Sequence, residues 1–341
     1  MIKNNLTAAA LLGALVLASC ESKERLYIYN WTYYTPPGVL EKFEQEYNIE
    51  VIEDNFDSNE SMYTKIKAGG ADFDIVFPSC DYTKIMIDQG MLSEIDHSRL
   101  VNLKNIDPLV LKQADYDPEM RYSVPYYWGA AGITVNTEKI PEFERSWALL
   151  GQSGLAGRVT MLDDPREVFG DALKFLGYSV NTQNPEEIVQ AVALIKNQWL
   201  PNIHRFDAEA FAKNYATGSF WVVQGYPEGI FEEISGNTAM LLNTEFFIPQ
   251  EGGPAYIDSM CILQDAKNID AAHKFIDFIH RPEIYAEFCD TFRFPATVNI
   301  PARDLLKMKP MYQVEDLMNT ELKKDVGEAL TYYTTAWQEL R

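Results

Sequence analysis

The chain has 341 residues, with 29 lysines and arginines against 50 aspartates and glutamates, which gives a net charge of −21. This acidic balance argues against nucleic acid and anionic lipid surfaces as partners, and it mildly favours cationic ligands. Even without residues 1–19 the chain exceeds the roughly 250 to 300 residues at which one hydrophobic core usually stops growing, so two lobes are expected.

The first 19 residues have the pattern of a bacterial lipoprotein export signal. Lys3 supplies the basic start, and the apolar run over residues 6–18 is shorter than the roughly 20 residues that span a bilayer. The run ends on Leu17-Ala18-Ser19-Cys20, which resembles a lipobox. We therefore expect residues 1–19 to be a signal peptide and Cys20 to carry lipid that holds the protein at a membrane. The alternative is an ordinary cleaved signal with an incidental cysteine.

The remaining cysteines and the histidines give no sign of a disulfide framework or a metal site. Cys80, Cys261 and Cys289 are odd in number and widely spaced, so packing must provide the stability. The histidines are scattered. Even His273 and His280, seven residues apart on one helical face, have no evident third ligand. We expect no metal and no cofactor.

Strands and helices alternate along the chain. In the first part, the expected strands cover residues 26–29, 50–53 and 73–77, and the expected helices cover residues 38–47 and a segment from a Ser58 or Asn59 cap to residue 68. In the second part, the expected strands cover residues 131–135, 159–162, 219–223 and 256–263, and the expected helices begin at Asn184-Pro185 and cover residues 270–279. Alternation of this kind predicts a mostly parallel sheet in each lobe, with ligands bound beyond the carboxyl ends of the strands.

A cluster of aromatic residues spans the first strand and the loop after it: Tyr27, Tyr29, Trp31, Tyr33 and Tyr34. A period of two places Tyr27 and Tyr29 on one face of the sheet, which is typical of core residues. Trp31 and Tyr34 lie beyond the expected strand, where an exposed aromatic pair offers faces for a cation.

Acidic residues follow or enter two of the expected strands. Asp164, Pro165 and Glu167 fit a helix cap, with Asp164 as the N-cap and a capping-box glutamate three residues later. The same carboxylates could bind an ammonium group or, in an enzyme, divide acid and base roles. Tyr256 and Asp258 share one face of another strand, and Asp258 needs a partner if it is buried. That partner could be a cationic ligand or a lysine or arginine of the protein.

Several segments, taken in order, resemble the spermidine/putrescine-binding proteins of ABC transporters. They are Tyr29-Asn30-Trp31-Thr32, residues 58–63, Pro78-Ser79, residues 122–126, residues 163–169 and Asp258-Ser259. The match runs from about Leu26 to the C-terminus. It implies an α/β fold of the type II periplasmic binding proteins, in which two lobes with mostly parallel sheets are joined by a hinge. The N-terminal lobe would comprise residues 24–128 plus 257–298, and the C-terminal lobe residues 129–256 plus 299–341.

The same resemblance implies a polyamine site. Its aromatic walls would be Trp31, Tyr34, Tyr226, Tyr256 and Phe294, its acids Asp164, Glu167 and Asp258, and its polar positions Thr32 and Ser79. Family tryptophans are replaced by Tyr226 and Tyr256, and a family tyrosine by Phe294, so all three keep an aromatic face.

Three further positions depart from the family pattern. Where spermidine-preferring relatives have an acid, this chain has Tyr33. Where the family has a tyrosine and a glutamine, this chain has Asp81 and Lys323. Asp81 restores the charge lost at Tyr33, whereas Lys323 would repel an additional ammonium group or take its place.

The resemblance implies a monomeric, non-catalytic lipoprotein on the periplasmic side of a bacterial membrane. It would capture putrescine or spermidine by lobe closure and deliver it to the permease subunits of an ABC transporter. Lys323 and Tyr33 favour putrescine over spermidine. Two alternatives stay open from the residues: a polyamine sensor or adhesin on the same fold, and a hydrolase that uses Asp164 and Glu167 as a carboxylate pair.

Overall fold

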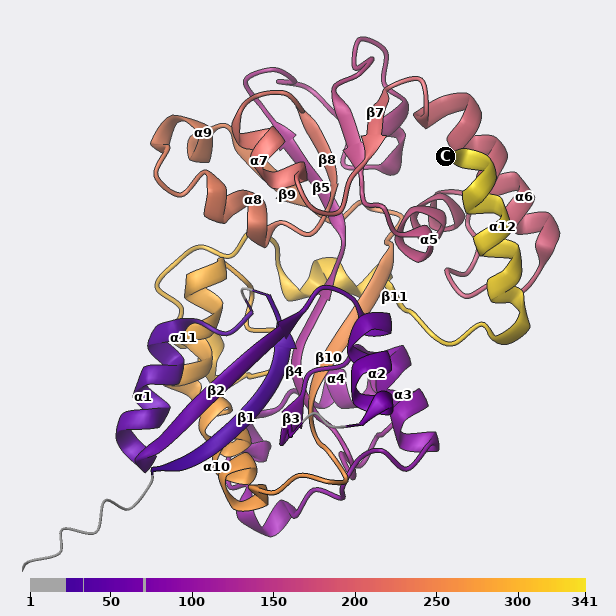
Figure 1. Cartoon of the computed structure of the whole chain (residues 1–341). Coiled ribbons are helices and arrows are strands. Elements are labelled where there is room, and N and C mark those ends of the chain that lie inside the picture. Colours follow the sequence, from indigo (N-terminus) through magenta and orange to yellow (C-terminus); the bar gives the residue numbers. More distant parts are fainter. Residues whose placement is uncertain (1–22, 33, 70–71) are drawn as a thin grey trace, which may run out of the picture.

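The computed structural model describes residues 23–32, 34–69 and 72–341. The expected signal peptide, Cys20 and Tyr33 lie outside the described residues. Two lobes lie one above the other, each built around its own sheet, and three connections join them (Figure 1). Within the described ranges, no helix is long and apolar enough to cross a membrane.

The first lobe contains a six-stranded sheet in the order β11-β10-β3-β1-β2, with β4 paired to β10. Its strands are β1 (Glu24–Trp31), β2 (Ile49–Phe56), β3 (Ile75–Val76), β4 (Val124–Ala130), β10 (Pro254–Ile262) and β11 (Glu321–Leu322). Its helices are α1 (Pro37–Tyr47), α2 (Asn59–Ala68), α3 (Cys80–Asp88), α4 (Pro108–Gln113), α10 (Ile269–Ile279) and α11 (Pro282–Phe292). Strand β1 runs parallel to β2 and β3, whereas β10, which arrives from the second lobe, runs antiparallel to β3 and β4.

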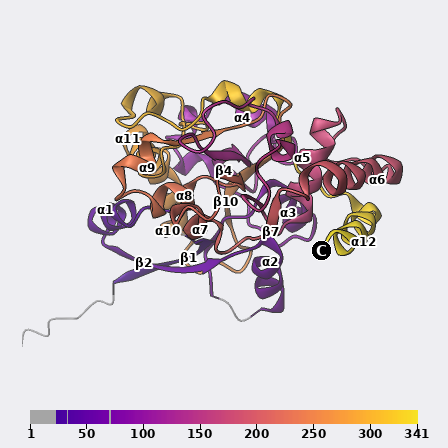
Figure 2. The same cartoon turned by 90° about the horizontal axis from the view of Figure 1, so that it is seen from above.

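The second lobe contains a five-stranded sheet in the order β7-β6-β8-β5-β9. Its strands are β5 (Gly132–Asn136), β6 (Val159–Met161), β7 (Ile203–Phe206), β8 (Val222–Gly225) and β9 (Thr244–Phe247). Its helices are α5 (Pro165–Phe175), α6 (Pro185–Leu194), α7 (Phe211–Ala216), α8 (Glu228–Glu233), α9 (Thr238–Leu242) and α12 (Leu330–Leu340). Helix α12, at the end of the chain, packs on α5 and α6, and Figure 2 shows it beside α6 from above.

Local sequence signals explain where several helices begin. Ser58 caps α2 by accepting a hydrogen bond from the Ser61 amide at 3.3 Å, and Asn184 caps α6 in the same way. Several strand bounds differ from expectation. β1 and β2 extend to Trp31 and Phe56, beyond the expected residues 26–29 and 50–53, whereas β3 is shorter than residues 73–77 and β8 begins at Val222, three residues later than expected. Residues 74–80 around β3 are all buried, and such a run does not mark where strand pairing begins, whereas the residues before β8 include the exposed Ser219 and the partly buried Trp221.

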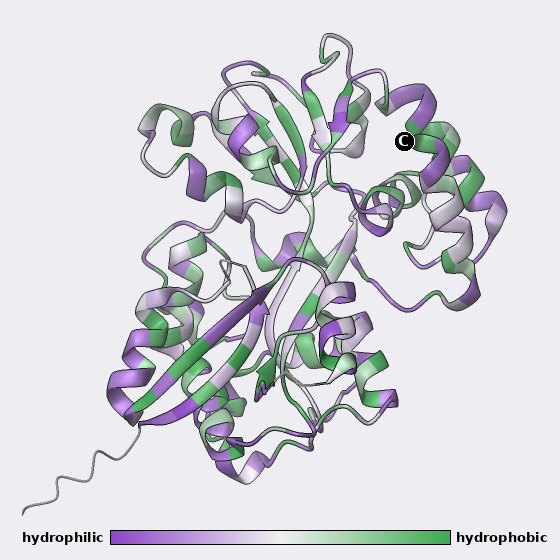
Figure 3. Ribbon diagram, in the orientation of Figure 1, coloured by the Kyte–Doolittle hydropathy of each residue, from purple (hydrophilic) through white to green (hydrophobic). Residues whose placement is uncertain are grey.

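Each lobe has its own large hydrophobic core. Figure 3 shows hydrophobic stretches along the strands and hydrophilic residues along the outer helices. Tyr29 is buried, as expected for a core residue, whereas Tyr27 on the same face is half-buried. Cys80, Cys261 and Cys289 are free and buried, so these three thiols contribute to stability through packing.

The lobes are joined at Ala131, at residues 248–253 and at residues 323–329. The second connection requires glycine, because Gly252 has a φ of +77° and a Cβ there would lie 1.9 Å from the Asn319 carbonyl oxygen. Residues Ala302, Tyr312, Leu317 and Leu322 all pack in the core of the first lobe. We therefore propose that the chain re-enters the second lobe near Val326, later than the residue 299 expected from the resemblance.

Candidate functional site

Asp258 lies in the middle of β10 and is 4% exposed. The Ser79 hydroxyl donates to its Oδ1 at 2.6 Å and the Tyr34 hydroxyl to its Oδ2 at 2.7 Å. Burial raises the pKa of Asp258 to about 6, against the lowering effect of these two hydrogen bonds and of the Lys323 charge. Within the described part of the chain Asp258 has no ion-pair partner, although a buried carboxylate calls for one. The partner expected from the sequence is therefore not a neighbouring lysine or arginine.

The two aromatic residues expected to be exposed after β1 are not equivalent. Trp31 is the last residue of the strand and is half-buried; its indole N–H donates to the Phe77 carbonyl at 2.9 Å. Tyr34 is 6% exposed, and its ring packs edge-on against Tyr126 at a centroid distance of 5.2 Å. The expectation of an exposed pair is wrong for Tyr34, because its hydroxyl finds a buried partner in Asp258.

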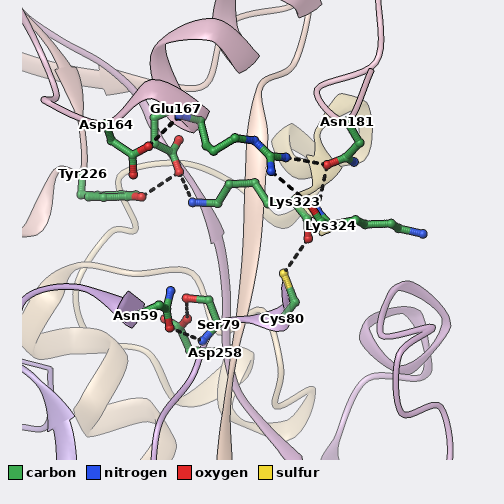
Figure 4. A network of polar contacts seen from close by, with 11 residues as sticks. Asn59, Ser79, Cys80, Asp164, Glu167, Asn181, Tyr226, Asp258, Lys323 and Lys324 are labelled. Atoms are coloured by element: carbon green, nitrogen blue, oxygen red, sulfur yellow. Dashed lines mark hydrogen bonds and ion pairs between the residues drawn. The ribbon is translucent and has the colours of Figure 1, made fainter. Parts of the chain in front are cut away.

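A second acidic group lies at the start of α5 in the other lobe. Asp164 is the N-cap and accepts hydrogen bonds from the amides of Arg166 at 2.8 Å and Glu167 at 3.2 Å, so the capping interpretation is correct for this residue. Glu167 does not complete the capping box. Its fully buried side chain turns toward Lys323 and the Tyr226 hydroxyl, and the latter donates to Oε1 at 2.9 Å (Figure 4).

Lys323 forms an ion pair with Glu167 and is 11% exposed at its side chain. Burial opposes its charged form, but the carboxylates of Glu167, Asp164 and Asp81 outweigh burial and raise the pKa of the ammonium group. Burial raises the pKa of Glu167, and the Lys323 charge opposes that rise. The backbone of Lys323 is held by the first lobe, since its amide donates to Ala255 and its carbonyl accepts from the Cys80 thiol at 3.3 Å (Figure 4). Lys323 thus links the two lobes.

Aromatic rings connect the two acidic groups. The rings of Tyr226 and Tyr256 meet edge to face at a centroid distance of 5.6 Å, one from each lobe. Tyr256 in turn approaches Tyr127, and Phe294 stacks on Tyr127 at 4.3 Å. Gly129 makes room for Tyr256, because a Cβ at Gly129 would lie 2.6 Å from the Tyr256 hydroxyl.

The remaining expected residues lie at the ends of strands of the first lobe. Ser79 is the N-cap of α3, and Asp81 is in its first turn with a buried Oδ1 that has no hydrogen-bond partner among the described residues. Thr32 is exposed, and its amide donates to the Phe56 carbonyl at 3.4 Å. The geometry therefore brings Ser79 to Asp258, whereas no hydrogen bond among the described residues joins the Thr32 side chain to the other expected residues.

Two acids with buried carboxylate oxygens, Glu228 and Asp171, were missed by the sequence analysis. Glu228 opens α8; burial raises its pKa to about 7, its charge acts on Tyr256, and its Oε2 has no partner in the described part of the chain. Asp171 is fully buried one turn after Glu167. Glu228 lies three residues after the end of β8 at Gly225, so the strand-end pattern that drew attention to Asp164 would have found it. Asp171 lies inside helix α5 and not at a strand end, so no sequence pattern indicated it.

His273 and His280, the two histidines on one helical face, make contacts within the first lobe. The Asp96 amide donates to His273 Nε2 at 3.0 Å, and the fully buried ring of His280 stacks on Tyr285. Among the described residues, no group of three or more histidines, cysteines and acids could hold a metal ion.

Comparison with known proteins decides the family. Residues 38–314 match the model of a family described as bacterial extracellular solute-binding protein. The chain belongs to this family. It is 38% identical over 345 residues to the spermidine/putrescine-binding periplasmic protein of Salmonella typhimurium, covering 98% of this chain and 97% of the relative. It is 31% identical over 319 residues to the putrescine-binding periplasmic protein PotF of Escherichia coli, covering 89% and 85%.

A solved structure supports the same assignment. The Tp0655 (TpPotD) lipoprotein of Treponema pallidum superposes with a TM-score of 0.89 at 45% identity, covering 93% of this chain and 99% of that one. The predicted resemblance and the two-lobed type II fold are thereby confirmed. These relatives bind solutes, so the solute-binding protein described here is not an enzyme, and the hydrolase alternative is wrong. Family membership also gives it an extracytoplasmic location.

Proposed function

We propose that this solute-binding protein captures a polyamine between its two lobes, prefers putrescine to spermidine, and delivers it to an ABC permease. The observation that carries the proposal is Asp258, a buried acid whose side-chain oxygens, among the described residues, accept hydrogen bonds from two neutral hydroxyl groups and from no cation. A buried carboxylate is stabilised by a cation, and charge-assisted hydrogen bonds are about twice as strong as neutral ones. A ligand ammonium group would supply that charge.

Unpartnered acceptors support binding of more than one amino group. Asp81 Oδ1, Glu167 Oε2 and Glu228 Oε2 are buried and have no hydrogen-bond partner among the described residues. Leaving such atoms unpaired costs about 1–3 kcal/mol each. The rings of Tyr226 and Tyr256 pack edge to face, and the charges of Glu167 and Glu228 act on Tyr226 and Tyr256 respectively, so apolar ring surface for a methylene chain lies close to these acids. A molecule with apolar carbons between separated ammonium groups suits this arrangement.

The preference for putrescine rests on Lys323. Its ammonium group already neutralises Glu167, so one acid of the site has an internal cation. A diamine needs fewer acids than a triamine. We therefore expect the third amino group of spermidine to be repelled by the Lys323 ammonium group or to displace it from Glu167. Either effect weakens spermidine binding and does not affect putrescine.

Calorimetric titration of the protein with putrescine and with spermidine tests the proposal. We expect saturable binding of both and tighter binding of putrescine. Tighter binding of spermidine would overturn the preference, and absence of binding to either would overturn the polyamine assignment. Mass spectrometry of ligand released from freshly purified protein provides an independent check.

Membrane attachment and partners complete the proposal. We infer that Cys20 carries lipid, which is supported by the similarity to a Treponema pallidum lipoprotein. A tethered monomer would stay close to the permease that it loads. Metabolic labelling with a radioactive fatty acid, compared between the natural chain and Cys20→Ser, would show label only in the natural chain.

The alternative function is a polyamine sensor on the same fold. Measuring polyamine transport with and without a co-expressed permease distinguishes a sensor from a transport component.

A further inference from the structure

Helix α8 of the second lobe reaches across to the first lobe. It contacts α11, and the two helices lie near each other in both views (Figures 1 and 2). Phe231 of α8 packs against the small hydrophobic cluster around Ile230 in its own lobe and also against the core of the first lobe. The guanidinium carbon of Arg293, which follows α11, lies 5.9 Å from the centre of the Phe231 ring. This distance is within the range of cation–π attraction.

The backbone at Arg293 indicates that its side chain has a role. Arg293 ends α11 with a φ of 56°, a left-handed conformation that favours glycine or asparagine at the end of a helix. An arginine there costs conformational energy that glycine would avoid. Its neighbour Phe294 is one of the expected aromatic walls, so the strained position directly precedes the candidate site.

Helix α8 also carries a residue of the candidate site. Glu228 lies three positions before Phe231, close to one helical turn, and its charge acts on Tyr256 and Asp258 of the first lobe. Residues three apart share one side of a helix. The side of α8 that holds an unpartnered acid toward the site is therefore also the side from which Phe231 reaches the first lobe.

We propose that Phe231 and Arg293 form a latch that holds the two lobes together over a bound ligand. The latch rests on the proposed function, because it acts on a closed, ligand-bound state. A ligand ammonium group near Glu228 would draw α8 toward the first lobe, and the contact with Arg293 then slows reopening. The contact lies outside the ligand site, so it sets how long a ligand stays and not which ligand is chosen.

The substitution Arg293→Gly separates a latch from a structural role. Glycine relieves the left-handed backbone, so the thermal midpoint of the ligand-free protein should stay the same or rise. Loss of one partly exposed cation–π contact should speed putrescine dissociation about two- to fivefold in stopped-flow measurements, with little change in the association rate. The substitution Asn48→Gly is the matched control. Asn48 ends α1 with a φ of 54° and is exposed on the first lobe, so its replacement should leave dissociation unchanged.

A double-mutant cycle with Phe231→Ala identifies the partner. If the two side chains act together, the double variant should dissociate no faster than the faster single variant. Independent, multiplying effects would overturn the latch, and so would an unchanged dissociation rate in Arg293→Gly or a lower thermal midpoint of that variant. Failure of the natural protein to bind putrescine or spermidine would overturn the proposed function and the latch together. Normal binding with an unchanged dissociation rate in Arg293→Gly would overturn the latch alone.

Discussion

The Tyr34 hydroxyl donates a hydrogen bond to Asp258 Oδ2 over 2.7 Å and so joins the loop after β1 to the middle of β10. Because both groups are buried, removing the donor with Tyr34→Phe leaves a carboxylate oxygen without this partner. We expect the free energy of unfolding to fall by about 1–3 kcal/mol, measured by urea denaturation of the ligand-free protein. Tyr63→Phe is the control, since the Tyr63 hydroxyl donates to Gln89 at an exposed site and should cost less than about 0.5 kcal/mol. Equal losses in the two variants would contradict a special role for the buried pair.

Asp258 should contribute strongly to the affinity for putrescine. With Asp258→Ala, a ligand ammonium group would be left without its carboxylate in a buried site, and we expect putrescine binding to weaken by more than roughly tenfold. Titration calorimetry at pH 7.5 measures the effect. Asp270→Ala, on the surface of α10, removes the same charge from the same lobe and should leave affinity unchanged. An unaltered affinity in Asp258→Ala would remove this residue from the site.

The protonation of Asp258 and Glu228 should make stability depend on pH. Burial raises the pKa of these acids in the folded protein to about 6 and about 7, above their unfolded values of roughly 4. The folded state therefore binds protons more tightly, and the stability that these groups contribute is present below about pH 4 and is lost as the pH rises through 6 to 7. In the double variant Asp258→Asn, Glu228→Gln, urea unfolding of the ligand-free protein should show a smaller loss of stability between pH 4 and pH 8.

Polyamine affinity should follow the opposite trend. Aliphatic amines stay charged up to about pH 10, so between pH 5 and pH 8 only the acids of the site change. We expect putrescine binding to tighten over this interval as Asp258 and Glu228 ionise, with proton release near pH 6. Calorimetry in two buffers with different ionisation enthalpies would detect the released protons. An affinity that is constant over the interval would mean that these acids do not meet the ligand.

The sequence was informative about the fold because its signals are local. Helix caps such as Ser58 and Asn184 and the alternation of strands and helices depend on neighbouring residues, and the structure has them where they were expected. The lengths of β3 and β8 depend on which strands pair, and a buried apolar run does not specify its partners.

The site was harder to predict because its contacts join distant segments. Tyr34 meets Asp258, 224 positions later, and Lys323 meets Glu167, 156 positions earlier. Spacing alone made Asp164 the N-cap and Glu167 its capping-box partner, but in the structure only Asp164 caps α5, and Glu167 faces Lys323. The resemblance supplied these positions, but it did not include Glu228, which opens α8.

Lys323 should govern the preference between putrescine and spermidine, and the substitution Lys323→Gln tests this. Lys323→Gln keeps a hydrogen-bond donor near Glu167 but removes the charge, so Glu167 becomes a buried acid that an additional ammonium group can neutralise. We expect the affinity for spermidine relative to putrescine to rise at least about tenfold, which corresponds to about 1.4 kcal/mol.

The same substitution should lower the stability of the ligand-free protein by about 3 kcal/mol, because one partner of a buried ion pair is lost. Lys324→Gln is the matched control. The Lys324 side chain is 55% exposed, and its ion pair with Asp115 lies at the surface, so both ligand preference and stability should stay nearly unchanged. Calorimetry with both polyamines on the two variants measures the preference. If Lys323→Gln lowered the affinity for both ligands equally, Lys323 would be a support for Glu167 and not the residue that discriminates between a diamine and a triamine.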